Sequence, residues 1–235
     1  MYKLLKWNKV NLESKTKFLY DILVSDLKSL PNKQKKERKK LQGFIDELNY
    51  LQLKINQIST DLIPKLQLKI GIQFTSSELI FIALSRPSVR NIFENLKIYF
   101  KNGSNNNPQK LNEEELNHLD ILASLGDASN VLALIGDSAL NLATSIALWD
   151  NRLTTSGAIT KKKEKIVSNA NLAEFSNRFN LYNYRIKIFK DESEKSSKKL
   201  SVNAEKGTLI EAIFGVIYLE HGLDGLTSIV PLLYN

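Results

Sequence analysis

The sequence predicts an all-α protein. Along most of the chain the apolar residues recur at steps of three and four, the spacing that places them on one face of a helix. Short polar turns rich in asparagine, glycine and proline separate these segments. Only the stretch "YRIKIF" (184–189) alternates weakly in the manner of a β-strand. We therefore expect helices joined by short turns.

The N-terminal part is predicted to form two helices. The first spans about 11–30 and ends at "LPN" (30–32), whereas the second opens with "KKERKK" (35–40) and runs to about Leu62. The apolar spacing of the second helix is typical of a coiled-coil seam. We expect this seam to pack on the first helix as a hairpin; the alternative is a docking surface for another protein. Its apolar residues are Leu41, Ile45, Leu48, Leu51, Ile55, Ile58 and Leu62.

Pro64 is expected to end this region, which divides an N-terminal helical extension (1–63) from a second domain (64–235). Helical patterns continue beyond it. The asparagine-rich tract "KNGSNNNPQ" (101–109) and the polar tract 190–207 are predicted to be loops. The chain then closes with the apolar helix "TLIEAIFGVIYLEHG" (208–222).

The composition of the chain excludes several kinds of functional site and favours one kind of partner. There are no cysteines, which excludes disulfides, thiolate metal sites and cysteine nucleophiles, and the two histidines lie far apart. The net charge of +8 favours a polyanionic partner such as nucleic acid, although such a charge also serves solubility. No run approaches the ~20 apolar residues of a membrane span. The basic N-terminus lacks an apolar signal core and has no acidic residue before Glu13, as in the tail of an organelle presequence.

One apolar helix carries a carboxylate. The stretch "NVLALIGDSALNLA" (130–143) is apolar on nearly every side, yet Asp137 lies in its middle. A buried charge is costly unless it is paired or binds a metal. Asp137 therefore needs partners from elsewhere in the chain.

Four stretches, in order, resemble the ribonuclease III endonuclease domain over roughly Leu66 to Leu233. They are "LKIGIQFTSSELIFIALSRPS", "NVLALIGDSAL", "SGAITKKKEKIVSNANLAEFSNRFNL" and "LIEAIFGVIYLEHG". The resemblance implies that family's fold, preceded here by the helical extension.

The family's chemistry rests on four carboxylates, a pair on each of two helices, that form a cage for Mg²⁺. Asp137 and Glu211 occupy one family position on each helix, so one carboxylate of each pair remains. The resemblance thus implies a vestigial site without a cofactor, with Asp137 satisfied by Thr208, a backbone group or water and with Glu211 as its neighbour. The alternative is that the pair still binds Mg²⁺. The other acidic positions of the family are occupied by Asn130, Ala133, Ser156 and Thr208.

RNA binding tolerates the loss of metal-binding carboxylates better than catalysis does, because lysines contact phosphates without a metal. For each basic run, the alternative is an ordinary solvated surface. The second run weighs more, since the helix that follows it resembles a segment on the family's RNA-facing side. The candidates are Lys33, Lys35, Lys36, Arg38, Lys39 and Lys40 in the first run, and Lys161, Lys162, Lys163 and Lys165 in the second.

The family pairs through the helix that carries Asp137. Leu134 replaces the family's phenylalanine at the dimer interface, which favours a non-identical partner or a looser homodimer, unless Leu134 is simply a core residue. Among known relatives the chain most resembles the fungal mitochondrial large-subunit ribosomal proteins with this fold. That resemblance implies an inactive structural protein in mitochondria, bound to ribosomal RNA or another structured RNA, to a second ribonuclease III-like subunit and to neighbouring ribosomal proteins.

Two alternatives remain. One is an active Mg²⁺-dependent double-stranded RNA endonuclease, mitochondrial or cytoplasmic, with further carboxylates supplied by residues 112–120 or Asp127. The other is a non-ribosomal scaffold for an active partner.

Overall fold

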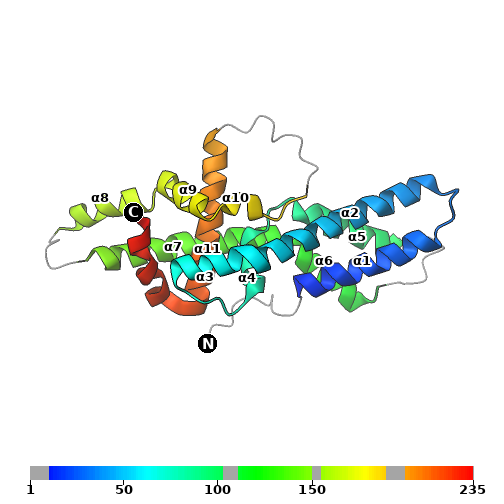
Figure 1. The fold of residues 1–235 in the computed structure, drawn as a ribbon, viewed down its shortest axis with the longest axis horizontal. Coiled ribbons are helices and arrows are strands. Elements are labelled where there is room, and N and C mark those ends of the chain that lie inside the picture. The colour runs from blue at the N-terminus through cyan, green and yellow to red at the C-terminus, as the bar shows by residue number, and fades with distance from the viewer. Residues whose placement is uncertain (1–10, 103–110, 150–154, 189–198, 235) are drawn as a thin grey trace.

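A computed structural model describes residues 11–102, 111–149, 155–188 and 199–234 (Figure 1). Within these ranges the chain is helical, and the one β contact is an isolated parallel bridge between Ser85 and Ile186. The all-α prediction is confirmed. The helices are α1 (Leu12–Ser29), α2 (Lys35–Gln57), the π-helix η2 (Ile58–Leu62), α3 (Ile63–Ile70), α4 (Ser77–Leu84), α5 (Val89–Asn102), α6 (Glu113–Ala123), α7 (Leu125–Leu148), α8 (Ser156–Ile166), α9 (Asn169–Arg178), α10 (Leu181–Tyr184), α11 (Lys199–Ile229) and the 3₁₀ helix η4 (Val230–Leu233).

The predicted N-terminal hairpin is confirmed. Asn11 begins α1 because its side chain accepts a hydrogen bond from the Ser14 amide at 2.8 Å. All seven seam residues of the second predicted helix are buried within the chain, so the alternative of a docking seam is wrong. The seam packs on α1 and on the rest of the protein, and its residues belong to one hydrophobic core that continues to Leu233.

Pro64 does not end the helical segment. The helix passes through the expected boundary at 63/64 and stops at Gly71, which adopts a positive φ of 78°. Proline removes an amide donor and its ring crowds the preceding turn. Here the π-helix 58–62 widens the turn immediately before the proline, and the chain continues as α3. The extension is thus joined to the following residues by a helix.

The final helix begins earlier than expected. Residues 199–207, predicted to be part of a loop, form the start of α11, while 190–198 lie outside the described residues. Glu205 explains the difference, because its carboxylate lies 3.2 Å from Arg86 Nε and 3.6 Å from Arg185 Nε. At the other predicted loop, α5 includes Lys101 and Asn102, and 103–109 also lie outside the description.

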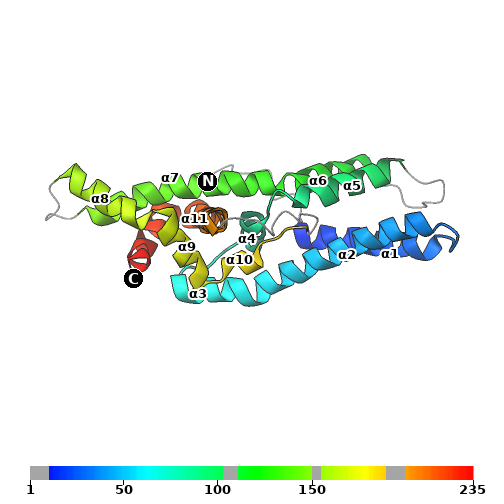
Figure 2. The ribbon, with the colours of Figure 1, turned by 90° about the horizontal axis from the view of Figure 1, so that it is seen from above.

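The centre of the fold is the crossing of α7 and α11. The long helix α7 lies parallel to the long axis of the molecule and α11 crosses it, while α2 and α3 lie on the other side of α11 from α7 (Figures 1 and 2). A Cβ atom at Gly136 would lie 1.9 Å from the carbonyl oxygen of Glu211, and one at Gly215 would lie 2.1 Å from that of Leu132. The two backbones therefore touch where each helix lacks a side chain.

The same two segments are the most apolar of the described chain. Residues Leu125–Leu148 and Val202–Leu233 are long and apolar enough to cross a membrane by length and composition, contrary to the expectation from uninterrupted apolar runs. Their packing against each other accounts for this composition, since α7 and α11 form the most extensive helix pair among the described elements. The prediction that the chain has no membrane span stays a prediction.

The crossing gives a direct test of packing. Gly136→Ala is expected to destabilise the protein by at least about 2 kcal/mol, because its methyl group would overlap the Glu211 backbone. Gly43→Ala in α2 is the matched control: nothing lies within 4 Å of its Cβ position, and alanine is expected to raise stability by up to about 1 kcal/mol. Urea denaturation of both variants measures the difference. Equal effects would contradict the close crossing.

Candidate functional site

The crossing brings the two predicted carboxylates together. Asp137 follows Gly136 on α7, and Gly136 lies against the backbone of Glu211 on α11. Both side chains are half-buried. Burial raises the pKa of Glu211 to about 7, and the negative charge of Asp137 adds to this rise. Glu211 is therefore the expected neighbour of Asp137, and the two carboxylates repel each other across the crossing.

The partner of Asp137 is on its own helix. The side-chain amide of Asn141 donates to the Asp137 carboxylate at 3.0 Å and to the Asp137 carbonyl oxygen at 2.9 Å. Thr208, one of the partners expected from the sequence, instead donates its hydroxyl to the Ala204 carbonyl at 3.1 Å. The Thr208 hydroxyl therefore does not donate to Asp137. The i, i+4 spacing of Asp137 and Asn141 was a visible signal in the sequence.

The four substituted acidic positions add no charge to this pair. Ala133 is buried one turn before Asp137 on α7, and Thr208 precedes Glu211 by one turn on α11. Asn130 is exposed on α7, and Ser156 is exposed at the start of α8. None of these side chains carries a negative charge.

Carboxylates from elsewhere do not replace them. Asp127 pairs with Arg90, Asp120 pairs with Lys97, and Glu115 accepts from the Asn112 amide in a capping box. Among the described residues no group of three or more His, Cys, Asp or Glu side chains is placed to hold a metal. The donor set thus consists of two carboxylates and the Asn141 amide. It does not match the four-carboxylate cage that the family uses for Mg²⁺.

The histidines lie apart from the site. His118, on α6, is 3.9 Å from Glu114, whereas Nε2 of His221 is 2.8 Å from the Gln73 carbonyl oxygen. Next to His221, Glu220 accepts from the amides of Thr75 and Ser76, both at 2.9 Å, just before α4. These contacts fasten the turn before α4 to α11.

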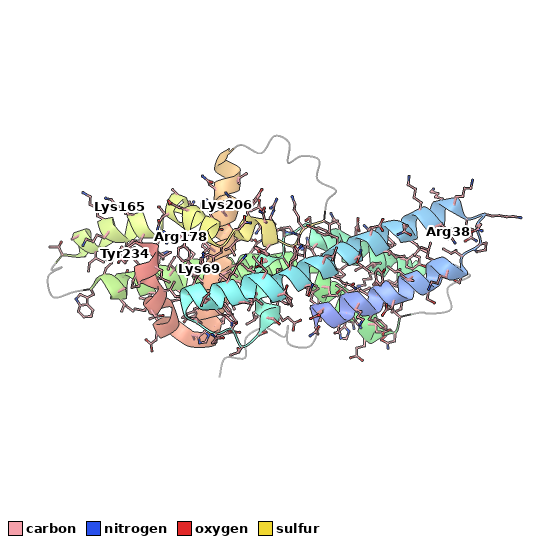
Figure 3. All side chains as sticks on the ribbon, in the orientation of Figure 1. Arg38, Lys69, Lys165, Arg178, Lys206 and Tyr234 are labelled. Carbon is pink, nitrogen blue, oxygen red and sulfur yellow. The ribbon has the colours of Figure 1, made fainter. Side chains whose placement is uncertain are left out.

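The two predicted basic runs lie at opposite ends of the protein. In Figure 3, Lys165 marks the α8 end and Arg38 marks the end of the α1–α2 hairpin. Arg38 is half-buried and donates to the carbonyls of Leu27 and Leu30 at 2.9 and 2.7 Å, so it stabilises the end of α1. Lys163 is also half-buried. The remaining predicted lysines are exposed, namely Lys33, Lys35, Lys36, Lys39, Lys40, Lys161, Lys162 and Lys165.

Leu134 is not a core residue, because 67% of its surface is exposed. It belongs to a row of exposed apolar side chains along α7, here called the α7 stripe, that ends at Trp149 with 77% exposure. Sequence reasoning found only Leu134, because a helix that is apolar all round does not reveal which face is covered. The α7 stripe consists of Val131, Leu134, Leu142, Ile146 and Trp149.

The raised pKa of Glu211 makes stability depend on pH. The carboxyl of the unfolded chain titrates near its ordinary value of 4.5, and the folded one near 7. Below pH 4.5 both states hold the proton. Between about pH 4.5 and 7 the unfolded chain loses it while the folded chain keeps it, so stability falls as pH rises; above pH 7 the folded chain carries an unfavourable charge at Glu211. Glu211→Gln should therefore stabilise the protein at pH 8, on the order of 1 kcal/mol after solvent screening, and change little at pH 4.

Urea denaturation at pH 4, 6 and 8 measures this difference. Glu164→Gln, at an exposed position on α8, is the control. A stabilisation by Glu211→Gln that is equal at all three pH values would contradict the raised pKa.

Known proteins resemble the part of the chain that builds the crossing. Residues 130–222 match the Ribonuclease III domain family. The chain is 29% identical to Ribonuclease 3 of Borreliella burgdorferi over 161 residues, which are 68% of this chain and 63% of that protein. It is 30% identical to Ribonuclease 3 of Ehrlichia ruminantium strain Gardel over 132 residues, 55% of this chain and 56% of that protein. The matches thus span less than two thirds of these relatives.

Two structures of the nuclease domain of ribonuclease III from Campylobacter jejuni are also similar. One is 22% identical with a TM-score of 0.47 and covers 73% of this chain and 94% of that domain. The other is 21% identical with a TM-score of 0.48, and covers 74% and 94%. The family match spans most of α7 and extends to Gly222 in α11. It therefore includes both carboxylates, Asp137 and Glu211. Over residues 130–222, which hold the crossing and both carboxylates, the chain is thus similar to the Ribonuclease III domain family.

Proposed function

We propose that this chain is a catalytically inactive, ribonuclease III-like RNA-binding protein. It serves as a structural component of the mitochondrial large ribosomal subunit, in a dimer with a second ribonuclease III-like protein and in contact with neighbouring ribosomal proteins. The observation that carries the loss of activity is the donor set at the α7–α11 crossing. Only Asp137 and Glu211 remain of the carboxylates, and the hydroxyl of Thr208, one turn before Glu211, donates to the Ala204 carbonyl instead.

The donors around the pair support this proposal. Burial and the charge of Asp137 raise the pKa of Glu211, so a second negative charge is unfavourable there unless a proton or a cation compensates it. The Asn141 amide supplies the one side-chain hydrogen bond to Asp137 among the described contacts. The chain's own residues therefore accommodate one charge and disfavour the second.

Exposed lysines support RNA binding. Lys161, Lys162 and Lys165 lie on the solvent side of α8, which packs against α7. The chain as a whole carries a net charge of +8. Double-stranded RNA is bound largely through its phosphates and its shape, for which such lysines suffice.

The α7 stripe supports pairing with a second subunit. An exposed apolar row on a helix that is otherwise packed in the core is a typical protein–protein contact. Leu134 lies within this row and Trp149 ends it. The stripe is interrupted by exposed Ser138 but is otherwise apolar, so it fits a largely apolar surface of a similar subunit.

An active Mg²⁺-dependent double-stranded RNA endonuclease, mitochondrial or cytoplasmic, is the second candidate. The observation in its favour is that Asp137 and Glu211 are retained side by side, since Mg²⁺ is held in some sites by two carboxylates and substrate phosphates. The named relatives are ribonucleases. Recovery of the chain with purified large ribosomal subunits would separate the ribosomal role from that of a free enzyme or scaffold.

Cleavage decides between the two candidates. We expect the purified chain to leave long double-stranded RNA intact in the presence of Mg²⁺ or Mn²⁺, while binding it with an affinity that falls steeply as salt rises. Glu211→Gln is the matched control. Cleavage by the native chain that disappears in this variant would contradict the proposal.

Dimerisation depends on the α7 stripe. In the absence of another subunit, the isolated chain is expected to self-associate weakly, and Leu134→Asp should abolish this by placing a charge in the apolar contact. Leu68→Asp is the control, because Leu68 is 86% exposed on α3, outside the stripe. Sedimentation velocity over a range of concentrations measures the association. A Leu134→Asp chain that associates as the native one does would contradict this interface.

A further inference from the structure

The end of the α1–α2 hairpin carries a dense positive charge. Residues 27–45 include six lysines and one arginine but a single acidic residue, Glu37. All six lysines are exposed, and no ion pair among the described residues involves any of them. This surface is here called the hairpin tip. It consists of Lys28, Lys33, Lys35, Lys36, Lys39 and Lys40.

The hairpin tip is held in a fixed shape. Arg38 donates to the carbonyls of Leu27 and Leu30, which closes the end of α1 against the start of α2. Further along the hairpin, Tyr99 of α5 donates its hydroxyl to the buried Asp26 carboxylate at 3.0 Å. At the other end of α1, the Leu12 amide donates to Glu78 of α4 at 3.1 Å. The lysines are thus presented by an arm that is fastened to the protein.

The hairpin tip lies far from α8. The two lie at opposite ends of the long axis, where Figure 3 marks Arg38 and Lys165 (Figures 2 and 3). Between them runs α7, whose 24 residues span about 36 Å at 1.5 Å per residue. For comparison, one compact double-stranded RNA-binding domain contacts ~16 base pairs of a duplex. Two basic surfaces this far apart reach different turns of one duplex or two separate helices.

We propose that the hairpin tip is a second RNA-binding surface, which engages a different RNA segment from the one at α8, so that a single chain bridges two segments. The inference rests on the proposed RNA binding and adds where on the chain a second RNA segment is held. The ligand at the tip is the phosphate backbone of RNA, contacted by lysines that do not read base sequence.

The surroundings of the lysines favour RNA over an anionic membrane. A helix that lies on a membrane combines basic residues with an exposed apolar face. Here the apolar residues of the same segment, Leu41, Phe44 and Ile45, are buried against the protein. No large apolar side chain between residues 27 and 45 is exposed. The tip offers charge alone, which fits a phosphate backbone.

Co-capture of two RNAs tests the bridge. One 12-base-pair RNA duplex is immobilised, the full chain is added, and retention of a second, fluorescent duplex of unrelated sequence is measured. The test variant changes Lys33, Lys35, Lys36, Lys39 and Lys40 to Gln together. The matched control changes the same five lysines to Arg, which keeps the charge. Thermal unfolding verifies that both variants are folded.

The native chain and the arginine variant are expected to retain the second duplex. The glutamine variant should bind the first duplex through α8 but retain the second at least tenfold less. Its binding to a long duplex should also depend less steeply on salt, because the slope falls by about 0.9 for each phosphate that the changed lysines no longer neutralise.

Three results would overturn the inference. Co-capture that survives in the glutamine variant would assign bridging to two α8 surfaces of a dimer. A native chain that binds single duplexes but never retains a second one would exclude bridging. Tip-dependent binding to phosphatidylserine vesicles, with RNA binding unaffected by the glutamine changes, would assign the tip to membranes. Absence of all RNA binding would instead overturn the proposed function itself.

Discussion

The contact between the α7 and α11 backbones is the constraint on which the rest of the structure depends. Gly136 and Gly215 each leave room for a carbonyl of the other helix, and any side chain at either position would overlap it. Because the helices touch there, the residues flanking the contact are brought close as well, among them Asp137 and Glu211. The remaining helices then bury the apolar sides of this pair in a core shared with the N-terminal hairpin. The same helix crossing thus positions both the core of the fold and the two carboxylates.

At this crossing the chain keeps a carboxylate pair without the other charges of a metal cage. Desolvation and the charge of Asp137 raise the pKa of Glu211 to about 7, and the amide of Asn141 satisfies Asp137 from its own helix. Two half-buried carboxylates close together lower the stability of the folded protein. Their partial exposure and the Asn141 amide keep this loss modest. The surfaces that the proposed function uses are the lysine-bearing ends and the α7 stripe.

Periodicity predicted much of the fold, since the seam of α2 and the helix 130–143 follow from the spacing of apolar residues alone. The failures have physical causes. The proline rule placed the end of the helix at Pro64, where a π-turn lets the chain continue; polar composition suggested a loop at 199–207, where Glu205 finds two arginines distant in sequence. The pairing of Asp137 with Glu211 followed from family resemblance, whereas the exposure of Leu134 depends on which face the core covers, which composition does not encode.

Divalent-cation binding at the crossing is the most direct test of this account. Titration of Mn²⁺ into the purified chain at pH 7.5, followed by the paramagnetic resonance signal of the free ion, counts the ions bound without relying on activity. The account predicts the same weak, non-stoichiometric binding for the native chain and for a chain with both Asp137→Asn and Glu211→Gln. One tightly bound ion per native chain, absent from the double variant, would show that the two carboxylates still form a working metal site and would contradict the account.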